Sequence, residues 1–206
     1  MKKIGTAIFD LDGVLIDSIE NMEYAWLNTC KQIKIKTPFK KYKKYIGLGL
    51  KVILKKIRVP KKKIKEAIYF YNHFSNIKIK NIKFYPNIFK VLKKIKKNYY
   101  IAIFTSKNKF RTIKCLKLIN LKFDKIITAD DIKNTKPSPE GLIKIKKSFI
   151  KKANKFFYFG DTNYDYLSAK SISMNYIHCN WGMGKCHDKK IKKIKSPAEI
   201  IKYLNQ

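Results

Sequence analysis

Two aspartates stand one residue apart at the end of an apolar stretch near the N-terminus. They are Asp10 and Asp12, within the sequence IFDLDGVLID that covers residues 8–17. A chain that only finishes a buried strand turns with residues such as Asn, Gly or Pro, and gains nothing from two neighbouring like charges. We therefore expect a cation beside them, and carboxylates are the ligands that hard divalent cations prefer.

Three further apolar stretches end on, or are followed by, polar residues of related chemistry. Thr105 ends YYIAIFT, Lys136 lies within KNTKPSPEG, and Asp161 begins the sequence DTNYD, which ends on Asp165. Carboxylates bind a hard cation, whereas a hydroxyl and a lysine bind the oxygens of a phosphoryl group. Together these residue types are typical of a phosphoryl-transfer site.

The elements that would hold these residues follow from the apolar pattern. Five β-rich runs stand out, and four of them precede lysine-rich helical patterns. The runs are residues 4–10, 99–105, 125–130, 155–161 and 175–179. This alternation predicts an α/β fold of Rossmann-like type, with a parallel sheet and helices on both faces. Because such sheets bind ligands at the carboxyl ends of their strands, the polar residues should converge on one pocket.

Residues 18–82 separate the first run from the second and have a different pattern. They read as amphipathic helices without a comparable strand, from a start at Ser18 to the helix-breaking Pro86 just beyond them. We predict that residues 18–82 form an all-helical cap inserted between the first and second strands of a core domain. The core domain would consist of residues 1–17 and 83–206.

Length and composition favour one α/β domain with an insertion. The chain has 206 residues, of which 45% are hydrophobic and 14% aromatic, so wholesale disorder is excluded. No apolar stretch approaches the roughly 20 residues of a membrane span, and Asp10 interrupts the N-terminal run too early for a signal peptide. We therefore expect a cytoplasmic protein. The four cysteines lack a short CxxC spacing, which argues against a disulfide framework.

The formal net charge of +34 raises the question of a nucleic-acid partner. Of the 48 basic residues only Arg58 and Arg111 are arginine, and the lysines are spread along the whole chain. A nucleic-acid-binding protein would use more arginine for bidentate contacts and would cluster its charge. The bias toward residues with adenine- and thymine-rich codons indicates a genome-wide effect instead. We expect no specific nucleic-acid partner and no membrane partner, and a positive field that attracts small phosphorylated metabolites.

Taken in order, the motifs resemble those of the haloacid dehalogenase superfamily of aspartyl-phosphate phosphatases. The chain has DLDG at residues 10–13, a strand that ends in Thr105, a lysine in KPSPE, and GDTNYD at residues 160–165. DGVLIDS, the helical insertion and CNWGMG are similar to the branch that contains phosphoglycolate phosphatase and beta-phosphoglucomutase. The likeness covers residues 4 to about 184. The cap is matched by its length, its helical character and the stretch YIGLGL, which we expect to face the pocket.

The resemblance implies roles for four aspartates. Asp10 would be the nucleophile, and Asp12 would be the general acid and then the general base. Magnesium would be held by Asp10, by the backbone carbonyl of Asp12 and by Asp161. Asp165 would be a further carboxylate of the metal site, either as a ligand or behind the ligands. The alternative for Asp165 is a favourable charge at the start of a helix.

The resemblance also implies a set of groups that bind the phosphoryl. Thr105 and the backbone N–H of Ser106 would donate hydrogen bonds to it, and Lys136 would offset its charge and steady Asp10. Thr105 and Lys136 also have an ordinary explanation, because a threonine often ends a strand and this chain has many lysines.

These roles imply a magnesium-dependent phosphatase that hydrolyses a small phosphorylated metabolite, either a phosphoglycolate-like phospho-acid or a sugar phosphate. A phosphomutase of the beta-phosphoglucomutase type would keep every motif and differ only in how the cap admits water and a second phosphate. A non-catalytic phosphate-binding module is a further alternative, which the presence of both Asp10 and Asp12 disfavours. The pattern identifies neither the substrate nor the oligomeric state.

Two other features call for an explanation. His178, Cys179, Cys186 and His187 lie within HCNWGMGKCH, but adjacent ligands on both arms match no common structural zinc spacing, and Cys179 ends an apolar strand. We therefore expect no zinc site. Ser173 stands where the resembled family tends to have glycine, which affects the turn after the last acidic motif and leaves the chemistry unchanged.

Overall fold

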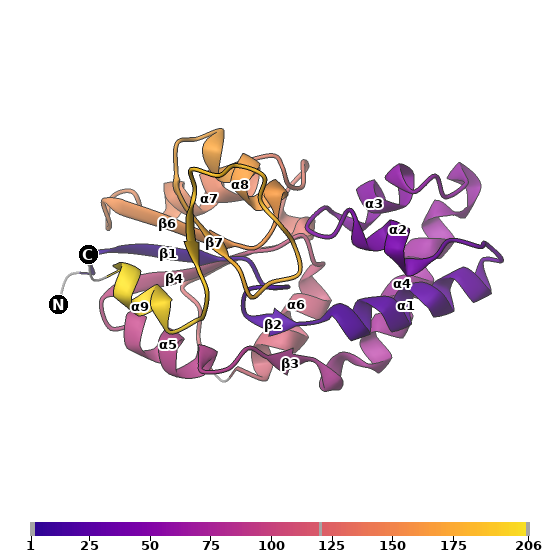
Figure 1. Cartoon of the computed structure of the whole chain (residues 1–206), viewed down its shortest axis with the longest axis horizontal. Coiled ribbons are helices and arrows are strands. Elements are labelled where there is room, and N and C mark those ends of the chain that lie inside the picture. The colour runs from indigo at the N-terminus through magenta and orange to yellow at the C-terminus, as the bar shows by residue number, and fades with distance from the viewer. Residues whose placement is uncertain (1–2, 120, 205–206) are drawn as a thin grey trace.

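A six-stranded parallel sheet forms the centre of the larger part of the molecule (Figure 1). The structure is a computed structural model, and it describes residues 3–119 and 121–204. In their order across the sheet, the strands are β5 (Lys125–Ile127), β4 (Tyr99–Phe104), β1 (Gly5–Phe9), β6 (Lys155–Gly160), β7 (Asn175–Cys179) and β8 (Lys192–Ile194). The predicted α/β fold class is therefore confirmed.

The five expected strands are present, and β8 is an addition that the sequence pattern did not indicate. Two of its three residues are exposed lysines, so it has no apolar run to detect. The strand expected at residues 125–130 is shorter and ends at Ile127. Ala129–Asp131 form a 3₁₀ turn, because the Thr128 and Asp131 side chains cap each other's backbone and end the strand.

The central strand β1 sets the position of the pocket. All five of its residues are buried, and it pairs in parallel with β4 on one side and β6 on the other. The chain runs outward through β4 and β5 on one side, and through β6, β7 and β8 on the other. Ligands of open parallel sheets bind where the strand order reverses in this way. The carboxyl end of β1 is thus the expected binding crevice.

Helices cover both faces of the sheet. The helices of the core are α5 (Ile88–Ile95), α6 (Lys109–Lys117), α7 (Glu140–Phe149), α8 (Asn163–Lys170) and α9 (Glu199–Leu204). Apolar residues of α5, α6 and α9 join one hydrophobic cluster, and those of α7 and α8 join a second. Successive residues of a strand point to opposite faces, so Phe9 belongs to the first cluster and Ile8 to the second.

A helical region lies beyond the carboxyl ends of the strands, at the right of Figure 1. It contains α1 (Ile19–Gln32), α2 (Phe39–Lys43), α3 (Leu50–Lys56) and α4 (Ile64–Ile77). These helices bury a hydrophobic cluster of their own, in which Trp26, Tyr42 and Tyr71 are the large side chains. The helical cap expected from the sequence is therefore present.

Two short strands connect this cap with the core. They are β2 (Ile16–Asp17) and β3 (Lys83–Phe84), which pair antiparallel as a ribbon of their own. We propose that the boundary between core and cap lies at this ribbon, so that residues 18–82 are the cap. The support is that the buried residues of the cap cluster all lie within residues 22–71, whereas of residues 18–82 only Ile79 and Ile82, close to β3, are buried in a core cluster.

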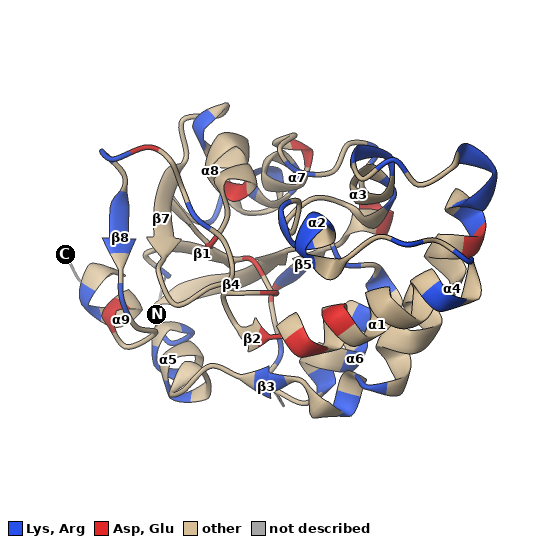
Figure 2. Ribbon diagram, turned by 45° about the vertical axis from the view of Figure 1, so that its right-hand side comes forward, with Lys and Arg blue, Asp and Glu red and all other residues tan. Residues whose placement is uncertain are grey.

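Lysine and arginine lie on helices all around the molecule, and acidic residues are few (Figure 2). Within residues 3–119 and 121–204, no helix has the length and apolar character needed to cross a membrane. Ser173, at the family's glycine position, has a φ of 51°. This left-handed conformation is the one that glycine adopts most easily, so the turn keeps its shape with serine in it.

Candidate active site

Polar side chains from several strand ends meet at the crevice beside β1. Asp10 follows β1, Thr105 follows β4 and Asp161 follows β6, while Lys136 comes from the loop between β5 and α7. All four side chains are buried, with exposed fractions of 3% or less. For the three residues that follow strands the local reason is the same, because an apolar strand carries the chain to this edge and the next residue is polar.

Three carboxylates form a compact cluster in this crevice. Asp10, Asp161 and Asp165 each offer one oxygen atom, and these atoms lie within 4.8 Å of one another. Oδ2 of Asp161 accepts hydrogen bonds from the backbone N–H groups of Met183 (2.8 Å) and Gly184 (3.1 Å). Its Oδ1 atom is buried and has no hydrogen-bond partner among the described residues. A buried oxygen of this kind calls for a ligand, so the cluster can hold a metal ion.

Gly13 explains why the DLDG motif ends in glycine. Its φ is +86°, and a Cβ atom at this position would collide with the carboxylate of Asp161. Both observations exclude larger residues. Gly13 therefore lets the loop after β1 approach the acidic cluster.

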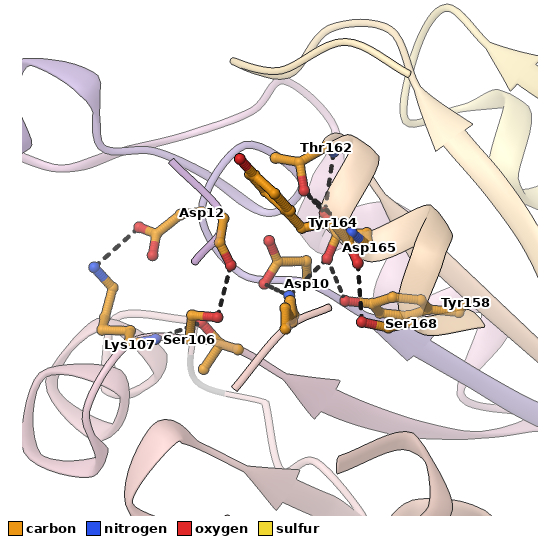
Figure 3. A network of polar contacts seen from close by, with 12 residues as sticks. Asp10, Asp12, Ser106, Lys107, Tyr158, Thr162, Tyr164, Asp165 and Ser168 are labelled. Atoms are coloured by element: carbon orange, nitrogen blue, oxygen red, sulfur yellow. Dashed lines mark hydrogen bonds and ion pairs between the residues drawn. The ribbon is translucent and has the colours of Figure 1, made fainter. Parts of the chain in front are cut away.

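Asp165 uses both of its oxygens within the protein. Oδ1 lies 2.6 Å from the Tyr158 hydroxyl and 2.7 Å from the Nζ atom of Lys136. Oδ2 accepts hydrogen bonds from the backbone N–H (3.0 Å) and the hydroxyl (2.6 Å) of Thr162, which begins α8 (Figure 3). Asp165 thus holds Lys136 through one oxygen and caps the start of α8 through the other.

Lys136 lies behind the nucleophile candidate and is fully buried. Its Nζ atom is 2.8 Å from Oδ1 of Asp10, in addition to its contact with Asp165, and it stands over the Phe104 ring at 4.8 Å. Although burial acts to lower it, the pKa of Lys136 lies above its usual value because of the two carboxylates. Lys136 therefore remains an ammonium ion that fixes the Asp10 carboxylate.

The cluster has more negative charge than this one ammonium offsets. Burial raises the pKa of Asp10 to about 7, against the opposing effect of Lys136. Burial also raises the pKa of Asp161 well above its usual value, and the charges of Asp165 and Asp10 add to the rise. Both shifts have the direction expected where a divalent cation is needed to keep neighbouring carboxylates ionised.

The Asp12 side chain has separate partners from those of Asp10. Its Oδ1 atom accepts a 2.5 Å hydrogen bond from Ser18. The same atom lies 3.0 Å from the Nζ atom of Lys107 (Figure 3). Although burial acts to raise it, the pKa of Asp12 lies below its usual value because of the Lys107 ammonium and the Ser18 hydroxyl. Ser18, at the start of α1, thus links the cap to this carboxylate and leaves the helix without a side-chain cap.

Thr105 and Ser106 lie at the end of β4 and face the cap. The Thr105 hydroxyl oxygen accepts a hydrogen bond from the backbone N–H of Lys107 (3.2 Å). The Ser106 hydroxyl donates to the carbonyl of Gly47 in the YIGLGL stretch (2.7 Å). Ser106 therefore joins core and cap directly, and YIGLGL faces the pocket as expected.

A small cavity of about 50 Å³ lies between core and cap at this point. From the core it is lined by Asp10, Asp12, Thr105, Ser106, Lys107 and Arg111. Apolar and aromatic side chains of the cap close it from the other side, among them Tyr42, Leu48 and Tyr71. Of the sequence-predicted residues, Asp10, Asp12, Thr105 and Ser106 line the cavity, whereas Lys136 and Asp165 support it from behind.

Lys107 and Arg111 are the two charged residues of this cavity that the sequence pattern did not indicate. Both are buried, with exposed fractions of 5%. Lys107 stands two residues after the expected Thr105. One more lysine gives no signal in a chain that is so rich in lysine. Arg111 had a signal of its own, since it is one of only two arginines in a chain that otherwise uses lysine.

The cysteine and histidine residues near the C-terminus have structural contacts. Nδ1 of His178 lies 3.0 Å from the Tyr176 hydroxyl, and Cys179 belongs to a hydrophobic core cluster. The Cys186 thiol donates a weak hydrogen bond to the Asn163 side chain. These contacts account for His178, Cys179 and Cys186.

Comparison with known proteins gives a consistent result. Residues 7–179 match the family described as haloacid dehalogenase-like hydrolase. The chain is 27% identical over 203 residues to a phosphoglycolate phosphatase from Aquifex aeolicus, covering 96% of this chain and 95% of that protein. It is 30% identical over 182 residues to the pyrophosphatase PpaX from Halalkalibacterium halodurans, with coverage of 84% and 81%.

Solved structures agree on the fold. A beta-phosphoglucomutase from Clostridium difficile superposes with a TM-score of 0.81 at 21% identity, and the match covers 98% of this chain and 96% of that one. At this identity the likeness concerns the fold alone.

Proposed function

Because the chain belongs to the haloacid dehalogenase-like hydrolase family, we propose that it is a magnesium-dependent phosphatase that acts through an aspartyl-phosphate on Asp10. One observation supports this proposal above the others. The Asp10 carboxylate stands at the end of the central strand, fixed by a buried lysine and next to Asp161, one oxygen of which has no partner within residues 3–119 and 121–204. A nucleophile and a candidate cation site are therefore adjacent at the carboxyl end of β1.

The first half of the reaction is phosphoryl transfer to Asp10. A carboxylate oxygen of Asp10 forms a bond to phosphorus as the bond between phosphorus and the leaving oxygen breaks. The leaving oxygen takes a proton from Asp12, whose side chain lies in the same cavity and is free of the acidic cluster. Lys136 holds Asp10 in place for this attack.

The second half is hydrolysis of the aspartyl-phosphate. Asp12, now a carboxylate, takes a proton from a water molecule, whose oxygen attacks phosphorus as the bond to Asp10 breaks. Lys107 and Ser18 stabilise the ionised form of Asp12, which is the form that this step needs. The same contacts make Asp12 a weaker source of protons in the first half. Substrates whose leaving group needs little protonation should therefore react fastest.

The residues fit a magnesium ion. Asp161, with its free buried oxygen, and Asp10 would hold it, together with the backbone carbonyl of Asp12. When bound, the ion would offset the charge of the phosphoryl group and of the carboxylates around it. Asp165 would support the ligands, since its oxygens are taken by Lys136, Tyr158 and Thr162. Thr105 and the backbone N–H of Ser106 would donate hydrogen bonds to the transferring phosphoryl.

The substrate class we propose is a small phosphorylated metabolite. The relatives named phosphoglycolate phosphatase and pyrophosphatase support this class, as does the small volume of the cavity. The family thereby favours a small molecule over a macromolecule as the partner of this site.

Phosphate release from a panel of small phosphate esters and anhydrides, with and without Mg²⁺, tests the proposal. We expect release that depends on Mg²⁺ and is lost when Asp10 is replaced by Asn. The panel should include 4-nitrophenyl phosphate as an activated ester. Absence of phosphate release from every substrate would overturn the proposal, and formation of isomeric sugar phosphates without release would indicate a phosphomutase instead.

A further inference from the structure

Arg111 reaches from the core to the cap at one end of the cavity. It lies in the first turn of α6, where Asn108 caps the helix by accepting a hydrogen bond from the Arg111 backbone N–H. Its guanidinium stands over the Tyr71 ring of α4, with 5.3 Å between the Cζ atom and the ring centroid. The side chain is therefore held by aromatic packing and lies at the boundary of the two regions.

Part of the hydrogen-bonding capacity of this guanidinium is unused. Its Nε atom is buried without a partner among the described residues. One Nη atom lies 3.4 Å from Oδ1 of Asn72, an oxygen that also accepts a hydrogen bond from the Asn108 side chain (3.2 Å). Buried donors without an acceptor are rare in native proteins and cost free energy. A ligand that accepts these hydrogen bonds would remove the cost.

The charge at this end of the cavity is also uncompensated. Arg111 and Lys107 bring two positive charges, and Asp12 brings one negative charge that is already paired with Lys107 at 3.0 Å. Within the part of the chain that the structure describes, the positive charge without a partner is that of Arg111, whose guanidinium also has an unused hydrogen-bond donor. Arginine binds carboxylate and phosphoryl groups particularly well, because its planar donors match two oxygens at once.

The size of the cavity limits how far the second anionic group can be from the phosphoryl. The volume is about 50 Å³, and one water molecule needs about 10–15 Å³ on this measure. With the cap in this position, a short substrate spans the space between Asp10 and Arg111.

We propose that Arg111 recognises a second anionic group on the substrate. The preferred substrates are then short phosphate esters or anhydrides that carry a carboxylate or a second phosphoryl within a few atoms of the scissile phosphorus. This inference deepens the proposed function and rests on it, since Asp10 must act on the same molecule. Arg111 is a specificity-determining residue that joins the cap to the substrate.

A matched set of substrates tests the inference. The probes are 2-phosphoglycolate, inorganic pyrophosphate and 2-hydroxyethyl phosphate, the last being nearly isosteric with the first but without the carboxylate. We expect kcat/KM of the wild-type protein to be about 100-fold or more higher for one of the two doubly anionic probes. The identity of the preferred probe shows whether the site binds a carboxylate or a second phosphoryl group.

Arg111→Met should lower kcat/KM for the preferred probe about 100-fold and change that for 2-hydroxyethyl phosphate less than about threefold. Lys114→Met is the matched control, because Lys114 is exposed on the same helix and has the same charge. This control should leave both values unchanged. Arg111→Lys, which keeps the charge without the planar donors, should recover part of the preference.

Several results would overturn the inference. One is a wild-type protein that hydrolyses the neutral and the doubly anionic probes equally well. Another is an equal loss on all three probes in Arg111→Met and in Arg111→Lys, which would show that Arg111 only joins core and cap. If the wild-type protein does not hydrolyse 4-nitrophenyl phosphate, that result contradicts the proposed function instead. The rise in melting temperature with 2-phosphoglycolate or pyrophosphate, compared with 2-hydroxyethyl phosphate, then tests the Arg111 site without turnover.

Discussion

The Nζ atom of Lys107 lies 3.0 Å from Oδ1 of Asp12, and both side chains are largely buried at the cavity. This contact separates the two aspartates of the DLDG motif, because Asp10 is held by a different lysine, Lys136. The pKa of Asp10 is raised to about 7 by burial, whereas that of Asp12 is lowered by Lys107 and Ser18 despite burial. Neighbouring carboxylates with opposite shifts are suited to different roles in one reaction.

Lys107→Met should move the acid limb of the pH profile of kcat to higher pH. The Lys107 ammonium favours the ionised form of Asp12, so its removal raises the pKa of Asp12. If hydrolysis of the aspartyl-phosphate needs ionised Asp12, activity is lost at a higher pH than in the wild type. Lys109→Met is the control, since the Lys109 side chain is 64% exposed. An unchanged acid limb in Lys107→Met would show that Asp12 is not the group that titrates.

Asp12→Asn should lower turnover by about 10²- to 10⁴-fold, the usual contribution of a general acid and base. The amide oxygen can still accept hydrogen bonds from Ser18 and Lys107, so folding should be less affected than in Asp12→Ala. Asp12→Ala removes this acceptor and leaves Lys107 buried without a partner, which should cost about 1–3 kcal/mol of stability. Turnover and thermal unfolding of both variants check this. Wild-type turnover in Asp12→Asn, or loss of its Mg²⁺ binding, would contradict the role.

The stability of the metal-free protein should fall as pH rises from about 4 to about 7 through the effect of Asp10. Its pKa is 3.8 in an unfolded chain and about 7 in the folded protein, so between these values the folded state holds a proton that the unfolded state has lost. Asp10→Asn does not titrate and lacks this decrease. Its unfolding free energy, measured against pH and compared with the wild type, isolates the effect. Added Mg²⁺ should stabilise the wild type most at pH 8.

Parallel pH dependences of the wild type and Asp10→Asn would show that Asp10 is ionised throughout this range. An equal effect of Mg²⁺ on the melting temperatures of both proteins would show that the ion binds elsewhere.

Gly13→Ala should weaken Mg²⁺ binding as well as folding. A methyl group at this position meets the Asp161 carboxylate, and φ of +86° is unfavourable for alanine by roughly 1–2 kcal/mol. We expect the melting temperature to fall and the concentration of Mg²⁺ needed for half-maximal activity to rise. Ser173→Gly is a useful comparison, since it places glycine at a positive φ far from the site and should be neutral or stabilising. An unchanged Mg²⁺ requirement in Gly13→Ala would show that Asp161 does not depend on this close approach.

The fold and the acidic end of the site follow from the sequence because they depend on local signals. Apolar runs locate the strands, and Asp10, Thr105 and Asp161 each follow one directly. The parallel topology then brings them together without further information. Strand β8 was not predicted because its exposed lysines give no apolar pattern.

The cationic side of the cavity could not be predicted in the same way. Arg111 packs against Tyr71 of the cap and Lys107 lines the cavity between core and cap, and contacts between distant segments leave no periodic signal. The uniform abundance of lysine removed the contrast that would have marked Lys107. The contacts of Asp165 with Lys136 and Tyr158 likewise depend on three separate segments of the chain.

Mapping the phosphoryl group on the protein tests the central claim most directly. The Asp12→Asn protein should be mixed with Mg²⁺ and 4-nitrophenyl phosphate, quenched in acid, digested and analysed by mass spectrometry. Since formation of the aspartyl-phosphate needs no proton for this leaving group, while its hydrolysis lacks a base, we predict one phosphoryl group on Asp10 and a burst of 4-nitrophenol. Asp10→Asn should show neither. Turnover by the wild type with no phosphoryl group ever found on Asp10, or turnover that persists in Asp10→Asn, would contradict the account.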